Sequence, residues 1–285
     1  RVDYRPSDRL VHAYFANVHA LDRYILKYLY DSYNKDSIPQ MVNVRLLKSL
    51  IREHLDNKDL CWPYMMSIHD YQGRIASLEG GIGAVATASG MAAEFITFAA
   101  LCQQGDHIVA SSQLYGGTVT QLDVSLRRFG IETTFVPGTD PADYKAALTE
   151  NTKAIYTEIV ANPSGEVADL EGLAEVAHEA GIPLVVDATL STPYLIRPIE
   201  HGADIVIHSF TKFLGGHGTT LGGIVVESGR FNWGNSNFPS MTEPVPSYNG
   251  VSWWGNFGEF GFLTKLRSEQ LRDFGPSLSP QSAFN

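Results

Sequence analysis

The sequence predicts an α/β fold, a mostly parallel sheet sandwiched by helices, with a helical segment at the N-terminus. Two observations support this prediction. From residue 73 onward, short apolar runs alternate with longer helix-like stretches, as they do in sheets covered by helices on both faces. All 26 glycines also lie after residue 72. With 285 residues, 44% of them hydrophobic, the chain can bury a large core.

Residues 1–72 differ from the remainder in composition. The segment has no glycine and is rich in tyrosine, leucine and lysine. Its apolar residues recur at helical spacing, most clearly at Leu21, Tyr24, Ile25, Tyr28 and Leu29. We therefore expect two units: a helical N-terminal segment over 1–72, whose role the sequence does not assign, and a larger domain over 73–285.

The larger domain is expected to alternate between helices and strands along the chain. The predicted elements, in order, are helix Ala92–Cys102, strand His107–Ala110, helix Thr118–Phe129, strands Thr133–Val136 and Ala154–Val160, helix Leu170–Ala180, and strands Pro183–Val186, Ile205–His208 and Gly223–Val226. The apolar window 83–102 carries a single charge, at Glu94, and is interpreted as a buried helix and not as a membrane span.

Charge and cysteine content exclude several classes of protein. The net charge of −10 disfavours nucleic-acid binding through a basic patch. The two cysteines, Cys61 and Cys102, do not form a disulfide framework and fit a reducing compartment, so we expect a cytoplasmic protein. No cysteine and histidine spacing predicts a metal site. The first residue is Arg1 and not Met, which indicates a fragment or a processed form.

Two charged residues follow predicted strands, where ligands bind in folds of this class. Lys212 lies after Ile205–His208, with the hydroxyls of Ser209 and Thr211 just before it. A lysine in such a setting can form a Schiff base if burial or nearby cations lower its pKa. Asp187 ends an apolar strand and could pair with the ring nitrogen of pyridoxal phosphate. The alternatives are a surface lysine and a carboxylate that caps a helix or forms a local ion pair.

Three further points could bind the same cofactor. Residues Ser89, Gly90 and Met91 open a helix, whose free N–H groups could hold a phosphate. Tyr115 follows another strand and could stack on a flat ring. Asn162 could donate to a phenolic oxygen. Each is also consistent with an ordinary turn or helix start, but together they match the contacts that pyridoxal phosphate requires.

The larger domain carries a series of short motifs: RIASLEGG (74–81), ASGMA (88–92), GDHIV (105–109), LYGG (114–117), RRFG (127–130), TPYL (192–195), GADIV (202–206), SFTKFLGG (209–216) and HGTTLGG (217–223). With these motifs, residues 74–285 resemble the Cys/Met-metabolism family of fold-type I pyridoxal-phosphate enzymes, and within it the O-acetylhomoserine sulfhydrylases. The resemblance implies a large cofactor-binding domain, with no counterpart of the family's C-terminal small domain in this chain.

The resemblance also implies a role for each candidate residue. Lys212 would hold the cofactor as a Schiff base and then move protons, and Asp187 would pair with the ring nitrogen. Tyr115 would stack on the ring and assist the leaving group, and Asn162 would contact the ring oxygen. The phosphate would bind to Ser89, Gly90, Met91, Ser209 and Thr211.

The implied reaction is γ-replacement on O-acetylhomoserine by sulfide or methanethiol, giving homocysteine or methionine. Two alternatives stay open. One is a cystathionine γ-synthase, cystathionine γ-lyase or methionine γ-lyase activity, and the other is a catalytically weak cofactor-binding homologue that acts as an assembly partner. The resemblance further implies a homo-oligomer, either a dimer or a tetramer. In this sequence Ala188 occupies the place after the aspartate where family members usually carry asparagine, and residues 1–72 contain no matching Tyr-x-Arg element.

Overall fold

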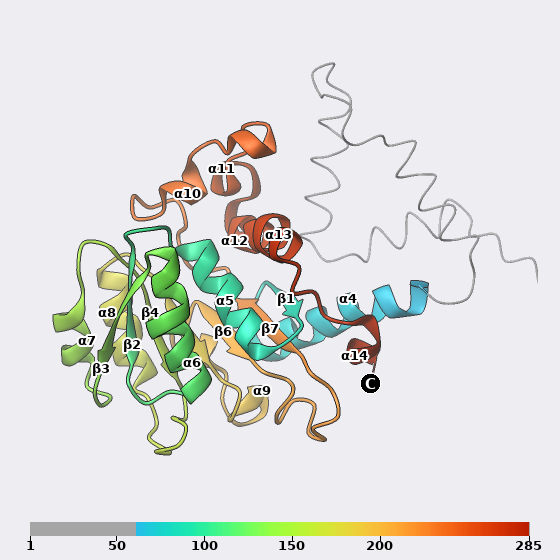
Figure 1. Ribbon diagram of the computed structural model, residues 1–285, viewed down its shortest axis with the longest axis horizontal. Helices are drawn as coiled ribbons and strands as arrows, with labels where there is room; N and C mark the ends of the chain where they lie inside the picture. The colour runs from blue at the N-terminus through green and yellow to red at the C-terminus, as the bar shows by residue number, and fades with distance from the viewer. Residues whose placement is uncertain (1–60, 285) are drawn as a thin grey trace, which may run out of the picture.

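The computed structural model describes residues 61–284 of the chain, and its centre is one seven-stranded sheet (Figure 1). The strands lie in the order β1-β7-β6-β5-β4-β2-β3. Their bounds are β1 Gly83–Thr87, β2 His107–Ser111, β3 Glu132–Val136, β4 Thr152–Glu158, β5 Leu184–Asp187, β6 Ile205–His208 and β7 Gly223–Glu227. Because β7 pairs antiparallel with both β6 and β1, the other six strands all run in the same direction. The expected mostly parallel sheet is confirmed.

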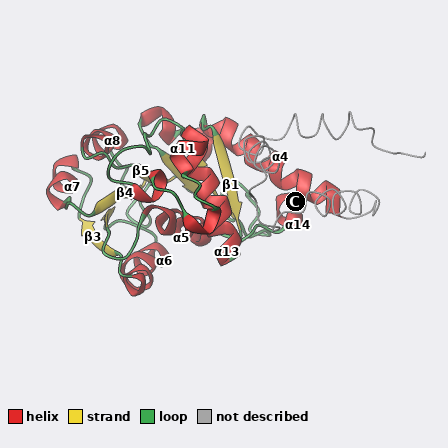
Figure 2. Cartoon of the chain, turned by 90° about the horizontal axis from the view of Figure 1, so that it is seen from above, coloured by secondary structure: helices red, strands yellow, loops and turns green. Residues whose placement is uncertain are grey.

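Helices cover both faces of this sheet, as Figure 2 shows. Helices α5 (Gly90–Leu101) and α6 (Gly116–Thr120) lie on one face, and α7 (Pro141–Ala147) and α8 (Leu170–Glu179) lie on the other. The remaining helices are α4 Cys61–Glu79, α9 Thr192–Leu195, α10 Pro239–Thr242, α11 Trp253–Phe257, α12 Gly261–Lys265, α13 Arg272–Phe274 and α14 Pro280–Phe284. Among the described helices, none is both long enough and apolar enough to cross a membrane.

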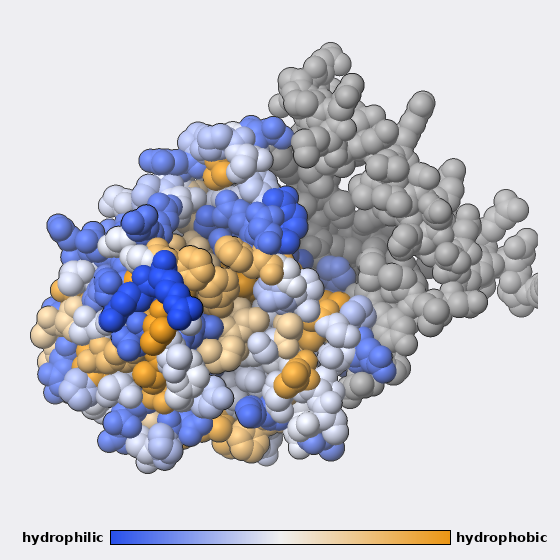
Figure 3. Space-filling view, in the orientation of Figure 1, coloured by the Kyte–Doolittle hydropathy of each residue, from blue (hydrophilic) through white to orange (hydrophobic). Residues whose placement is uncertain are grey.

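The core lies between the sheet and its helices. All five residues of β1, β2 and β7 are buried, which is typical of strands covered on both faces. Phe98 of α5 packs edge-on against Tyr156 of β4, with ring centroids 5.3 Å apart. The outer side of α5 is also apolar (Figure 3), where Phe95 contacts the half-exposed rings of Phe129 and Phe274.

One predicted element is wrong in part. We expected a buried helix across 83–102, but residues 83–87 form β1 and only α5 is helical. A short continuous apolar run has no periodicity that separates a buried strand from a buried helix. The predicted helix Thr118–Phe129 is a composite, because α6 continues into a π-helical turn (Gln121–Ser125) and a 3₁₀ turn (Leu126–Phe129) that ends at Gly130, where φ is +76°.

The predicted boundary near residue 72 falls within α4, which continues to Glu79 and packs against β1. Residues 1–60 lie outside the described part of the chain. The division into a helical segment and a larger domain therefore stays a prediction.

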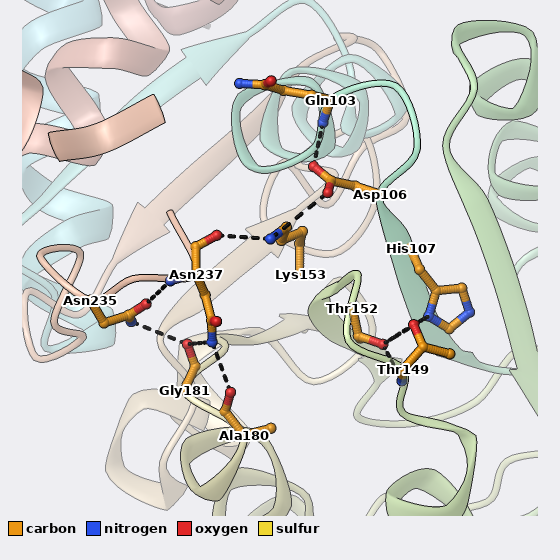
Figure 4. Close-up of polar contacts among 10 residues, drawn as sticks. All are labelled: Gln103, Asp106, His107, Thr149, Thr152, Lys153, Ala180, Gly181, Asn235 and Asn237. Carbon is orange, nitrogen blue, oxygen red and sulfur yellow. Dashed lines mark hydrogen bonds and ion pairs between the residues drawn. The ribbon is translucent and has the colours of Figure 1, made fainter. Parts of the chain in front are cut away.

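Polar contacts join the amino ends of the strands at the edge of the sheet shown in Figure 4. The Lys153 ammonium, near the start of β4, donates to the carbonyl of Asn237 at 2.9 Å and lies 3.8 Å from a carboxylate oxygen of Asp106. The Asn237 amide donates to the carbonyls of Ala180 and Gly181. These contacts hold the segment that follows β7 against the amino ends of the parallel strands. The candidate site residues lie at the opposite, carboxyl ends of these strands.

Candidate functional site

All the candidate residues lie at the carboxyl-end edge of the sheet. Tyr115 follows β2, Asn162 follows β4, Asp187 is the last residue of β5, and Lys212 follows β6. Strand β1 is parallel to β6, so the start of α5 reaches this edge as well. Helix α9, which follows β5, marks the edge at the bottom of Figure 1.

Ser89 caps the first turn of α5. Its backbone is extended (φ −165°), and its hydroxyl accepts a hydrogen bond from the N–H of Ala92 at 3.1 Å. Gly90 lies directly against the segment that follows β6: a Cβ added at Gly90 would lie 2.6 Å from the Cβ of Ser209. The absence of a side chain at Gly90 therefore lets the helix N-terminus and Ser209 approach each other. Met91 continues this first turn.

Residues 209–216 form a tight turn that presents Lys212. The Lys212 N–H donates to the carbonyl of Ser209 at 3.2 Å, and the Gly216 N–H donates to the carbonyl of Lys212 at 2.7 Å. Thr211 is held by Gly222, whose N–H donates to the Thr211 hydroxyl at 3.1 Å. The side chain of Lys212 is exposed. This corrects the expectation that burial would activate the lysine, because its short turn places it outside the core.

Asp187 and the turn that bears Lys212 are connected through Thr189, which the sequence analysis missed. One carboxylate oxygen of Asp187 accepts from the N–H of Thr189 at 2.7 Å, and the Thr189 hydroxyl accepts from the N–H of Ser209 at 2.8 Å. Burial raises the pKa of Asp187, while hydrogen bonds from Thr189 and the charge of His208 oppose this. A hydroxyl residue two positions after a strand-end aspartate is the signal that could have identified Thr189.

Glu158, the last residue of β4, also escaped the sequence analysis. Its two carboxylate oxygens accept from the backbone N–H groups of Tyr115 at 2.6 Å and Asn162 at 3.1 Å. Burial raises the pKa of Glu158 to about 7, and the Tyr115 N–H is the main group that opposes the shift. Glu158 therefore fixes the backbone of two predicted site residues. Its position beside Asp187 follows from strand register, which the sequence alone does not show.

The Tyr115 ring is half-exposed, with 51% of the residue accessible to solvent. It lies over Gly117, where an added Cβ would be 2.5 Å from the ring and 3.3 Å from the sulfur of Met91. Tyr115 is thus close to the first turn of α5. The side chain of Asn162 is exposed, and its hydrogen bond to Glu158 comes from the backbone.

The polar groups at the carboxyl ends of the strands fit a flat, phosphorylated ring that carries a positive charge. The N-terminus of α5 offers backbone N–H groups to a phosphate. A residue larger than glycine at position 90 would clash with Ser209 and push the two segments apart. The partly buried carboxylate of Asp187, at the end of β5, favours a cation. The Lys212 side chain, on the turn after β6, is exposed and carries the one kind of group, an amine, that can form a Schiff base with an aldehyde.

Comparison with known proteins is consistent with this arrangement. A family model described as Cys/Met metabolism PLP-dependent enzyme matches residues 67–285. The chain is 58% identical to a sulfhydrylase of Fusarium oxysporum over 216 residues, which are 75% of this chain and 50% of that protein. It is 47% identical to the O-acetyl-L-homoserine sulfhydrylase of Leptospira meyeri, across 74% of this chain and 50% of that protein. The chain therefore spans about half the length of these relatives.

A solved structure shares the fold. A Campylobacter jejuni protein assigned as an O-acetylhomoserine (thiol)-lyase superposes with a TM-score of 0.73 and is 33% identical, covering 76% of this chain and 54% of that one. That structure contains pyridoxyl-lysine monophosphate. The fold expected from the sequence, the large domain of fold-type I enzymes, is confirmed.

Proposed function

The chain belongs to the Cys/Met-metabolism family of pyridoxal-phosphate-dependent enzymes, and from this membership we propose that it catalyses γ-replacement on O-acetylhomoserine. The nucleophile would be sulfide or methanethiol, and the product homocysteine or methionine. One observation supports this proposal above the others. The N-terminus of α5, Asp187 and the turn bearing Lys212 contact one another at one edge of the sheet, through Ser209 and Thr189.

Pyridoxal phosphate supplies an electron sink that stabilises negative charge on the amino-acid substrate. Lys212 would bind the cofactor aldehyde through Nζ and later hold the proton removed from the substrate α-carbon. The Asp187 carboxylate would accept a hydrogen bond from the protonated ring nitrogen. Thr189 orients this carboxylate through its backbone N–H.

The other candidate residues would bind the remainder of the cofactor. The phosphate would accept from the first turn of α5, at Ser89, Gly90 and Met91, with Ser209 and Thr211 on the opposite side. Tyr115 would stack on the ring and assist the departure of the acetate. Asn162 would contact the ring oxygen, which requires its exposed side chain to turn inward.

We also propose that the protein is a homo-oligomer, a dimer or a tetramer. Large apolar side chains are exposed on the segments that follow β5 and β6, beside the site: Tyr194 at 91% and Leu195 at 73%, with Phe213 and Leu221 on the next segment. A second copy of the chain would cover them.

The cytoplasm is the proposed compartment, since the described free cysteine, Cys102, is a buried thiol. Light scattering and cell fractionation test these two points.

The proposal is tested with the full chain supplied with pyridoxal phosphate. We expect visible absorption of the bound cofactor and formation of homocysteine from O-acetylhomoserine and sulfide. Lys212→Ala should abolish both. The matched control is Lys145→Ala, which removes an exposed lysine that is paired with Glu179 on the far helices α7 and α8.

Three results would overturn parts of this assignment. A protein that binds no cofactor with Lys212 intact would refute the site. Elimination from cystathionine or methionine, without replacement on O-acetylhomoserine, would identify a lyase. Cofactor binding without turnover, together with co-purification with a longer homologue, would identify an assembly partner.

A further inference from the structure

Glu94 of α5 is a buried acid that the proposed function does not use. The residue is 3% exposed and lies between α5 and the sheet. One of its carboxyl oxygens, Oε1, accepts from the hydroxyl of Thr118 at 2.9 Å and from the hydroxyl of Tyr156 at 3.1 Å. The other oxygen, Oε2, is buried and has no hydrogen-bond partner. Ionising a carboxyl group that has a buried oxygen with no hydrogen-bond partner costs folding free energy, whereas burying the neutral acid costs much less.

Glu94 lies on the same face of the sheet as Asp187. Tyr156 and Glu158 are two residues apart on β4, so their side chains leave the sheet on one face. Asp187 is the register partner of Glu158 on the adjacent parallel strand, so its side chain shares that face. The Tyr156 hydroxyl donates a hydrogen bond to Glu94 of α5, so this face is the one that α5 covers.

The charged groups that act on Glu94 are both anions. These are Asp187 from β5 and Glu158 from β4, and with burial as the largest cause they raise the pKa of Glu94 to about 8. On β6, the charge of His208 lowers the pKa of Asp187, and the His208 ring is itself paired with the carboxylate of Glu79. The groups that face Glu94 from α6 and from the π-helical turn after it are neutral: the Thr118 hydroxyl donates to Glu94, and the amide of Gln121 donates to the carbonyl of Met91 in the first turn of α5. Among the described residues, no group of three or more acids, histidines or cysteines is arranged to hold a metal ion that would neutralise these anions.

Of the three acids, Glu94 is the one with a buried carboxyl oxygen, Oε2, that has no hydrogen-bond partner. Both oxygens of Glu158 accept from backbone N–H groups, and Asp187 accepts from the N–H of Thr189. When neighbouring carboxyl groups share a site, a proton binds to one of them and leaves the other ionised. We expect the proton to bind to Glu94, the acid whose negative charge would be least stabilised by hydrogen bonds.

We propose that Glu94 is a positioning residue of the cofactor site: it stays a neutral acid beneath the site, and so leaves Asp187 as the anion that meets the cofactor ring. This inference rests on the proposed pairing of Asp187 with the ring nitrogen. An ionised Glu94 would instead compete with Asp187 for one positive charge.

The first test uses infrared spectroscopy on the cofactor-free full chain, and so does not depend on cofactor binding. We expect a carbonyl-stretch band of a protonated carboxylic acid at neutral pH that disappears as the pH rises through about 8. Glu94→Gln should remove the Glu94 component of this band, while Glu158 and Glu227, whose pKa values burial raises to about 7 and about 8, contribute to the remainder. Glu179→Gln should leave the band intact, because the exposed Glu179 is paired with Lys145 and its pKa is lowered. A spectrum unchanged by Glu94→Gln would overturn the proposal.

The second test measures cofactor affinity as a function of pH. At neutral pH, Glu94→Gln should bind the cofactor as tightly as the parent protein, because glutamine mimics the neutral acid. Above pH of about 8 the parent gains a second anion near the ring, so its affinity should exceed that of the variant by about tenfold, which corresponds to about 1.4 kcal/mol. A tenfold loss for the variant at neutral pH would show that Glu94 acts as an anion and would refute the proposal. A merely structural role would alter stability without this change in pH dependence.

Two further variants separate the possible failures. Tyr156→Phe retains the ring but removes a donor that favours the ionised form of Glu94, so the infrared band should persist to higher pH. A band that titrates at lower pH would contradict the proposal even if Glu94→Gln does not fold. Asp187→Asn should weaken cofactor binding. If it does not, the proposed site is wrong, whereas the infrared result concerns Glu94 alone.

Discussion

Gly90→Ala tests the contact that brings the N-terminus of α5 to the turn bearing Lys212. An added Cβ would lie 2.6 Å from the Cβ of Ser209 and 3.1 Å from its Cα, whereas carbon atoms normally pack about 3.5–4.0 Å apart. Ser209 is anchored by its N–H to Thr189, so the helix or the turn must move. Overpacking of this kind costs about 1–3 kcal/mol. The helix propensity gained by alanine offsets at most about 1 kcal/mol of this cost.

The matched control is Gly73→Ala, in the middle of α4, where an added Cβ meets no other heavy atom within 4 Å. This variant should gain up to about 1 kcal/mol in the free energy of unfolding. Urea denaturation with linear extrapolation measures both changes, and a cofactor titration measures binding. We expect Gly90→Ala to lose stability and to weaken cofactor binding about tenfold, through displacement of Ser209. Unchanged stability and affinity in Gly90→Ala would refute this reasoning.

Two other predictions concern the hydrogen bonds of Thr189 and His178. Thr189→Val removes the acceptor of the partly buried Ser209 N–H at similar volume, so it should cost about 1 kcal/mol in unfolding free energy and weaken cofactor binding. Thr189→Ser should retain the parent's stability and affinity, and equal behaviour of the two variants would contradict the role of the hydroxyl. The hydrogen bond to Asp204 raises the pKa of His178, so this pair stabilises the fold fully below the unfolded pKa of about 6.5, and its contribution is lost as the pH rises through the folded value. The stability advantage of the parent over His178→Gln should therefore shrink in urea unfolding as the pH rises above about 6.5. An advantage that grows with pH would reverse the assigned sign.

Much of the sheet could be predicted because its strands are short apolar runs bounded by turn residues. Strand Ile205–His208 has the predicted bounds, and β2, β4, β5 and β7 differ from prediction by one or two residues at their ends. Strand β1 was missed because it runs into the equally apolar α5. Helix α7 was missed although Asp140 caps it, since the helix is only seven residues long.

The candidate site was predictable only for residues whose chemistry is visible in the sequence. Lys212 and Asp187 stand out as charged groups after apolar strands. Glu158, Thr189 and Glu94 do not, because their importance comes from the backbone N–H groups and hydroxyls that the register of the sheet brings to them. No spacing along the chain encodes those contacts.

The antiparallel pairing of β1 with β7 constrains the order in which the molecule can assemble. Within residues 61–284, β1 has no strand neighbour except β7, which is synthesised well over a hundred residues later. A ribosome-bound chain must therefore keep an apolar segment unpaired until β7 emerges, and closing so long a loop slows folding. The first turn of α5 follows β1 directly, so the end of the molecule that we propose to bind the phosphate should be among the last parts to mature.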